Sequence, residues 1–180
     1  MKLFIGTSAA NDIAEKYFVK TKELLDEIVK IEKIDLVFGG YSEGLMRISY
    51  ETFKNKKRTI TAISPSIYES DMLSLKCQNN IVTRDGIERT KEIYNNSDIF
   101  LFLPGGTGSL AEFFSIMKEI EETKQSKLII IYNIDNFYTP LITYLENLLK
   151  EKFIKKSIKE CCIIVDKKEQ IIKCLNEEVK

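Results

Sequence analysis

The chain has 180 residues, which is the common size of one domain and enough to enclose a substantial core. Lysine plus arginine and aspartate plus glutamate both number 27, so net charge alone cannot hold a nucleic-acid backbone or an anionic membrane. The absence of histidine excludes Ser-His-Asp and Cys-His nucleophile systems and every His-ligated metal site.

Short apolar segments alternate with longer segments of helical periodicity along the whole chain. Strands are expected at 2–6, 34–38, 59–64, 80–83, 98–103, 127–132 and 161–166. Helices are expected at roughly 9–31, 43–55, 85–96, 109–123, 137–151 and 167–178. This alternation predicts an α/β fold, a doubly wound, Rossmann-like parallel sheet of about seven strands in a single domain over residues 1–180. The strands at 98–103 and 127–132 are apolar throughout, so we expect them in the middle of the sheet.

Three further features restrict the class of protein to which the chain can belong. Segment 64–78 exceeds the usual loop length, so it is either a partly helical connection or a lid over a site. The cysteines show no CxxC spacing and are predicted to be reduced core thiols: Cys77, Cys161, Cys162 and Cys174. No apolar stretch approaches the roughly 18 residues that span a bilayer, so we expect a cytoplasmic protein that binds neither membranes nor nucleic acids.

Glycine- or hydroxyl-bearing turns follow three of the predicted strands, at 6–8, 39–44 and 104–109. In a parallel sheet these turns share the carboxyl edge, where ligands bind at the point of strand-order reversal. Their backbone N–H groups and helix N-termini can converge on an anion, and glycine allows close approach. The middle turn could instead serve only close helix packing. A phosphate-binding site is therefore predicted from Thr7, Ser8, Gly39, Gly40, Gly44, Gly105, Gly106, Thr107, Gly108 and Ser109.

The third turn, LPGGTGSLAE, matches neither the dinucleotide GxGxxG nor the GxxxxGK[ST] phosphate loop. No lysine follows its last glycine, which argues against ATP hydrolysis of the familiar loop type. Within it, Ser109 and Glu112 fit a capping box, in which the glutamate would only close its own helix start. Arg89 could likewise form only a surface ion pair with Asp85, four residues earlier.

Four segments, in order, resemble the LOG (Lonely Guy) family, long misannotated as lysine decarboxylases. They are VFGGYSEGLM at 37–46, IERTKE at 87–92, LPGGTGSLAE at 103–112 and YNIDNFYTPL at 132–141. The family patterns are GGG-x-x-GLMG, M-H-x-R-K, PGG-x-GT-x-x-E and N-V-D-G-Y-Y-x-P-L. EKFI at 151–154 sits where the family has E-G-F-I, so the resemblance covers nearly the whole chain.

The resemblance implies a phosphoribohydrolase that cleaves a nucleoside 5′-monophosphate, such as a cytokinin nucleotide, into free base and ribose 5-phosphate. It also implies that Arg89 and Glu112 are catalytic, that Gly105 to Ser109 bind the phosphate, and that the chain forms a homodimer. We expect no cofactor and no metal ion. Ile87 and Thr90 replace the family's histidine and lysine, which removes two polar contacts. The sequence is therefore equally compatible with a related hydrolase that acts on a nucleotide of another base.

N-glycosidic hydrolysis passes through an oxocarbenium-like sugar, so Glu112 would stabilise that charge and orient or deprotonate the water. Arg89 would position the phosphate or ribose. The alternative is a non-catalytic carrier of a nucleotide or phosphorylated cofactor, because carrier proteins for molybdenum cofactor share this kind of scaffold. An amino-acid decarboxylase is disfavoured because no lysine stands in a recognisable cofactor-linking context.

Overall fold

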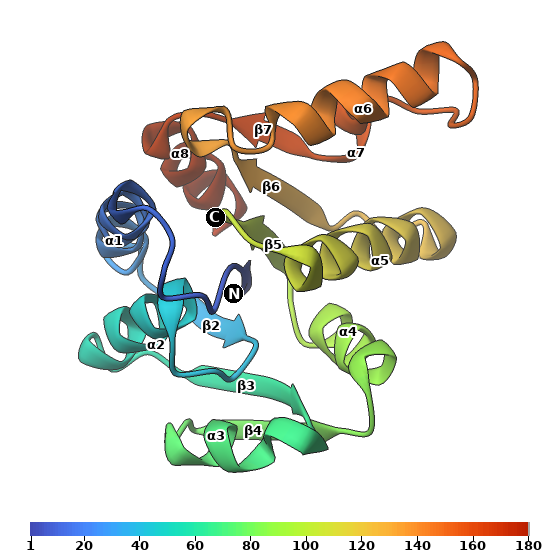
Figure 1. Cartoon of the computed structure of the whole chain (residues 1–180). Helices are drawn as coiled ribbons and strands as arrows, with labels where there is room; N and C mark the ends of the chain where they lie inside the picture. The colour runs from blue at the N-terminus through green and yellow to red at the C-terminus, as the bar shows by residue number, and fades with distance from the viewer. Residues whose placement is uncertain (180) are drawn as a thin grey trace.

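The computed structural model describes residues 1–179 and contains one seven-stranded parallel sheet with helices on both faces (Figure 1). The strands are β1 (Lys2–Gly6), β2 (Asp35–Phe38), β3 (Ile60–Pro65), β4 (Asn79–Thr83), β5 (Ile99–Phe102), β6 (Leu128–Tyr132) and β7 (Ile163–Val165). The helices are α1 (Glu15–Ile28), α2 (Gly44–Asn55), α3 (Glu69–Ser74), α4 (Gly86–Asn95), α5 (Thr107–Thr123), α6 (Thr139–Lys150), α7 (Ile158–Cys161) and α8 (Lys168–Glu178), with 3₁₀ turns η1 (Ser66–Tyr68) and η2 (Ile134–Asn136). The predicted α/β fold is confirmed.

Strand order is β4-β3-β2-β1-β5-β6-β7, so the order reverses between β1 and β5. In doubly wound sheets this reversal opens a crevice at the carboxyl ends of the two strands. The expectation that 98–103 and 127–132 form the middle of the sheet is only partly correct. β1 is central with β5 beside it, whereas β6 lies next to the edge strand β7. β6 is apolar throughout because helices cover both of its faces, not because it is central.

Successive strand residues enter two separate hydrophobic layers. Leu3 and Ile5 of β1 pack with Leu24 of α1 on one face, whereas Phe4 packs with Phe113 of α5 on the other. Figure 1 shows α1, α2 and α8 on the first face and α4, α5 and α6 on the second. The alternation follows from the two-residue period of a strand. Helices on both faces thus leave the carboxyl edge of the sheet as the place where turns can form a site.

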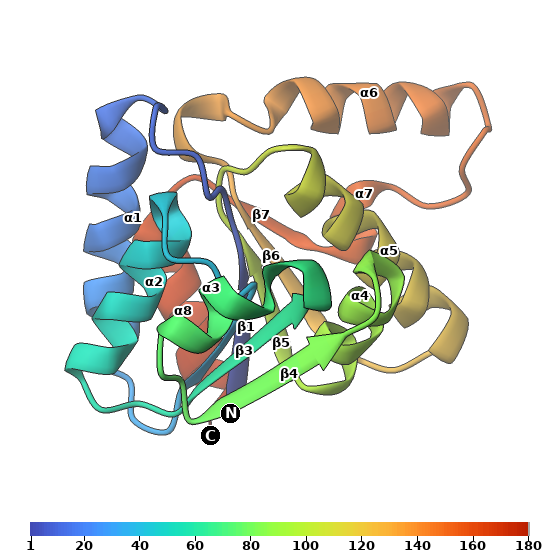
Figure 2. The ribbon, with the colours of Figure 1, turned by 60° about the horizontal axis from the view of Figure 1, so that its bottom comes forward.

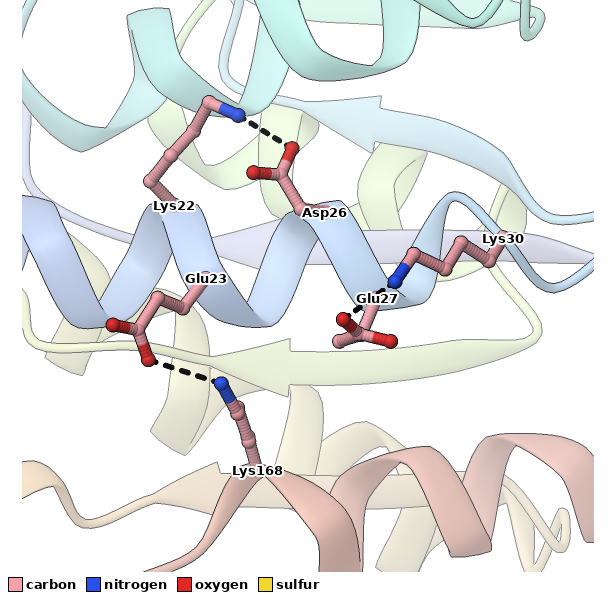
Figure 3. A network of polar contacts seen from close by, with 6 residues as sticks. All are labelled: Lys22, Glu23, Asp26, Glu27, Lys30 and Lys168. Carbon is pink, nitrogen blue, oxygen red and sulfur yellow. Dashed lines mark hydrogen bonds and ion pairs between the residues drawn. The ribbon is translucent and has the colours of Figure 1, made fainter.

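The outer surface of α1 carries a set of ion pairs (Figure 3). Lys168 of α8 contacts Glu23 of α1 at 3.0 Å, and Lys30 contacts Glu27 at 2.6 Å. Water and salt screen exposed pairs of this kind, so each adds little to stability. We interpret them as a solvated exterior that helps to align α8 with α1. Within residues 1–179, no helix combines the length and the apolar character that a membrane crossing requires.

Segment 64–78 is a partly helical connection, formed by η1 and α3. Met72 of α3 is completely buried, and the Tyr50 hydroxyl donates a hydrogen bond to the Leu75 carbonyl oxygen. These contacts fix the segment to the first hydrophobic layer. The four cysteines are free, as predicted, but only Cys162 is fully buried; the other three are partly exposed.

Gly44 starts α2 in a conformation that favours glycine, with φ at +56°. An added Cβ would lie 2.6 Å from the Ala9 carbonyl carbon. Gly44→Ala should therefore lower the free energy of unfolding through backbone strain and overpacking, each roughly 1–3 kcal/mol, as measured by urea denaturation. Gly86→Ala is the matched control, because an added Cβ there meets nothing within 4 Å. Equal unfolding midpoints for the two variants would contradict this account.

Candidate functional site

The turns after β1 and β5 interlock at the point of strand-order reversal. The Ser8 N–H and the Thr7 hydroxyl both donate to the Pro104 carbonyl oxygen at 3.2 Å. In return, the Ser109 hydroxyl donates to the Thr7 carbonyl oxygen at 3.1 Å. The hydroxyls of Thr7 and Ser109 are buried and hydrogen-bonded to the backbone of the opposite turn, so they hold the two turns together.

The start of α2 docks against the same turn. The N–H groups of Leu45 and Met46 donate to the Ser8 carbonyl oxygen at 2.9 and 3.3 Å. The Gly44 N–H donates to the Asn11 side-chain oxygen at 2.9 Å. All three predicted turns therefore lie at one edge of the sheet, as the sequence indicates. Gly40, with φ at +70°, and Gly44 shape this turn.

The first turn of α5 is open to solvent. Its N-cap, Gly106, supplies no side-chain hydrogen bond, and Gly106, Thr107 and Gly108 are exposed. The first N–H groups of a helix have no intrahelical partner, and they lie at the positive end of the helix dipole. Gly105 is needed for the tight turn, because a Cβ there would collide with the Ser109 side chain. This arrangement favours an anion at Gly106 to Gly108.

Arg89 on α4 and Glu112 on α5 form a buried ion pair, with 2.5 Å between Arg89 Nη1 and Glu112 Oε1. Arg89 Nε also donates to the Ile63 carbonyl oxygen of β3 at 3.0 Å. An added Cβ at Gly39 would lie only 2.6 Å from Arg89 Nη2. The guanidinium is thus held between β2, β3 and α5, and Gly39 provides the space that it fills.

Neither simpler structural role suggested by the sequence is present. α5 begins at Thr107 with Gly106 as its N-cap, so Ser109 is its third residue and Glu112 its sixth; neither occupies a capping-box position. On α4, Asp85 is the N-cap and accepts hydrogen bonds from two first-turn N–H groups at 2.9 Å. Arg89 therefore pairs across the helix interface with Glu112 instead of along its own helix with Asp85.

Burial dominates the electrostatics of this pair. Glu112 is 4% exposed, and this burial raises the pKa of its carboxyl, while the Arg89 charge and hydrogen bond act in the opposite direction. The neighbouring Tyr138 has a raised pKa because it is buried and because the Glu112 charge disfavours a phenolate. A buried carboxyl with a shifted pKa and a fixed cationic partner is typical of a functional site.

Tyr138 is a residue of this site that sequence reasoning did not identify. Its hydroxyl donates to the Leu103 carbonyl oxygen at 2.6 Å, directly before the third turn. The Asn133 side-chain oxygen fixes it by accepting the Tyr138 N–H at 2.7 Å. The signal available was the segment YNIDNFYTPL, whose resemblance to the LOG pattern assigned no role to any single residue.

A separate cavity of about 760 Å³ lies between α5, α6 and the segment around α7. Its walls include Phe114, Met117 and Phe153 and none of the predicted site residues. The carboxyl edge of the sheet is the better candidate site, because the Arg89–Glu112 ion pair and the three turns lie there. No cluster of three or more histidine, cysteine, aspartate or glutamate side chains suited to a metal ion occurs in the described chain.

Solved structures of low sequence identity share the fold. A molybdenum cofactor binding protein from Rippkaea orientalis is 19% identical, with a TM-score of 0.72 and coverage of 99% of this chain and 97% of that one. The molybdenum cofactor (Moco) carrier protein of Chlamydomonas reinhardtii is 18% identical, with a TM-score of 0.68 and coverage of 98% and 95%.

Sequence comparison gives relatives of known name. A "Probable cytokinin riboside 5'-monophosphate phosphoribohydrolase" of Oryza sativa subsp. japonica is 28% identical over 156 residues, which cover 86% of this chain and 64% of that protein. A cytokinin riboside 5′-monophosphate phosphoribohydrolase of Arabidopsis thaliana is 27% identical over 178 residues, covering 98% of this chain and 82% of that protein. The family described as "Possible lysine decarboxylase" matches residues 46–175. The chain therefore belongs to this family, the LOG family.

Proposed function

We propose that this chain is a phosphoribohydrolase that cleaves the N-glycosidic bond of a nucleoside 5′-monophosphate to release free base and ribose 5-phosphate. The observation that carries the proposal is the buried Arg89–Glu112 pair beside the open first turn of α5. The names of the rice and Arabidopsis relatives support hydrolysis of this type. The substrate class includes cytokinin nucleotides and nucleotides of other bases.

In the proposed reaction the phosphate binds the N–H groups at Gly106 to Gly108, which places the ribose toward Glu112. The C1′–N bond breaks, its electron pair leaves with the base, and positive charge develops on the sugar. Glu112 stabilises that charge and accepts a proton from the water that bonds to C1′. The proton passes to solvent, and the departing base takes one up.

Arg89 is proposed to position both the carboxylate and the ligand. Two of its five N–H donors face Ile63 and Glu112, so others remain for a sugar or phosphate oxygen. Its charge and its hydrogen bond lower the pKa of the buried carboxyl and so favour the ionised form, which a base requires. Burial acts in the opposite direction and raises the pKa of Glu112, which increases the affinity of the carboxylate for a proton.

The direct test is a panel of purine, pyrimidine and cytokinin nucleoside 5′-monophosphates incubated with the protein. We expect at least one of them to yield free base and ribose 5-phosphate in equal amounts, measured by chromatography and mass spectrometry. The matching nucleosides are the control, because without the phosphate they lack the group that α5 would hold. Release of inorganic phosphate instead of base would contradict the proposal.

A second candidate is a carrier that binds a nucleotide or phosphorylated cofactor without cleaving it. The observation in its favour is the structural likeness to molybdenum cofactor binding and carrier proteins, at TM-scores of 0.72 and 0.68. The same panel separates the two candidates. A protein that binds nucleoside monophosphates in equilibrium dialysis and returns them intact is a carrier.

A further inference from the structure

Two tyrosines from different elements meet at the carboxyl edge of the sheet. Tyr41 follows Gly40 in the turn after β2, and Tyr68 ends η1, three residues beyond β3. Their ring centroids are 6.2 Å apart and their planes are inclined by 75°, which is an edge-to-face contact. Tyr68 is 46% exposed, and Tyr41 is partly exposed.

The contacts of Arg89 show where the tyrosine pair lies relative to the Arg89–Glu112 ion pair. Arg89 lies against Gly39, two residues before Tyr41, and donates to Ile63, five residues before Tyr68. Figure 2 shows η1 continuing from the tip of β3. Because β2 and β3 are the second and third strands from β5, the turns after them lie about 10 and 14 Å from the turn after β5. The tyrosine pair therefore lies at the strand ends that Arg89 contacts, two and three strands away from the start of α5.

We propose that Tyr41 and Tyr68 form the platform on which the nucleobase stacks, an inference that rests on the proposed function. Along the edge of the sheet, the order would be open helix N–H groups, then the Arg89–Glu112 pair, then aromatic rings. A nucleoside monophosphate has the same order of phosphate, sugar and base, over a comparable length. Every nucleobase presents a π face, so aromatic rings hold it without requiring a particular base.

The exposed ring surface is the feature that distinguishes this pair from the buried aromatic contacts. Phe102 and Phe113, for example, are almost completely buried in the second hydrophobic layer and only fill the core. The tyrosine rings belong instead to two turns at the open edge. They are joined to the site through Gly39 and Ile63, both of which touch Arg89.

The test compares the binding of AMP with that of ribose 5-phosphate, which has no base. Tyr41→Ala and Tyr68→Ala should each weaken AMP binding by about 5-fold to 150-fold, the range expected for loss of one stacking contact. Their ribose 5-phosphate affinity should stay within about twofold of wild type, because the base contact is absent from that ligand. Both affinities come from isothermal titration calorimetry on the full chain carrying Glu112→Gln, in which AMP should remain intact during the titration.

Three further variants sharpen the comparison. Tyr41→Phe and Tyr68→Phe keep the ring and should bind AMP like wild type. Tyr144→Ala, on α6 and 59% exposed, is the control for losing a surface tyrosine and should change neither affinity. An equal loss for AMP and ribose 5-phosphate, or no loss for AMP, would overturn the platform. AMP bound through the tyrosines, with no nucleotide of the panel cleaved by the wild type, would instead overturn only the hydrolase. A wild type that binds no nucleotide would overturn both.

Discussion

Glu112→Gln should abolish most of the nucleotide hydrolysis while leaving the fold intact. Glutamine has the same shape and can still accept a hydrogen bond from Arg89, but it neither carries a negative charge nor takes a proton from water. A positioned acid–base group contributes about 10²–10⁴-fold to a rate, so kcat should fall within that range. Far-ultraviolet circular dichroism and a thermal melt should show a folded protein.

The matched control is Glu121→Gln, an exposed glutamate on the same helix, which should retain wild-type activity. An active Glu112→Gln protein would remove the catalytic role of this carboxylate. Under the capping-box explanation, Glu112→Gln would leave activity unchanged, because glutamine also serves in that motif. The structure excludes this explanation, since Glu112 is the sixth residue of α5. The variant therefore tests the chemistry of the carboxyl group directly.

Much of the fold could be predicted from apolar periodicity. All seven strands lie within one or two residues of their expected positions, because buried parallel strands are continuous apolar runs bounded by turns. The location of the three turns at one edge follows from the parallel order alone. The helix expected from residue 9 begins only at Glu15, since the preceding segment turns to bind the start of α2 through Asn11.

The partners of the charged residues could not be predicted in the same way. Local spacing suggested Asp85 for Arg89 and Ser109 for Glu112, because both patterns occur commonly within one helix. The observed pair joins residues on α4 and α5, two helices that contact each other in the folded chain, so it is a tertiary contact and not a local one. Burial then makes the pair a candidate for function, and the sequence has no signal for burial at a single charged position. The family resemblance alone singled out both residues.

Arg89→Met should destabilise the protein strongly at neutral pH. Methionine keeps much of the apolar volume but leaves Glu112 buried without its cation. Removing one partner of a buried ion pair typically costs about 3–5 kcal/mol, because the remaining charge is uncompensated. Urea denaturation at about pH 8 should show a loss of this size. Nucleotide binding should weaken as well, since a charge-assisted contact to the ligand is lost.

The pH dependence of that loss separates an uncompensated charge from a simple packing defect. Burial already raises the pKa of Glu112 above the ordinary 4.5, and Arg89 is the neighbour whose charge and hydrogen bond lower it. A raised folded-state pKa favours folding below the unfolded value and loses this contribution as pH rises through the folded one. The difference in the free energy of unfolding between wild type and Arg89→Met should therefore be largest at about pH 8 and shrink toward about pH 5.

The double variant Arg89→Met, Glu112→Gln is the control, because it has no buried carboxylate. It should be more stable than Arg89→Met at the higher pH and show no such recovery on acidification. If Arg89→Met is destabilised equally at both pH values, the loss comes from packing and not from the uncompensated charge of Glu112.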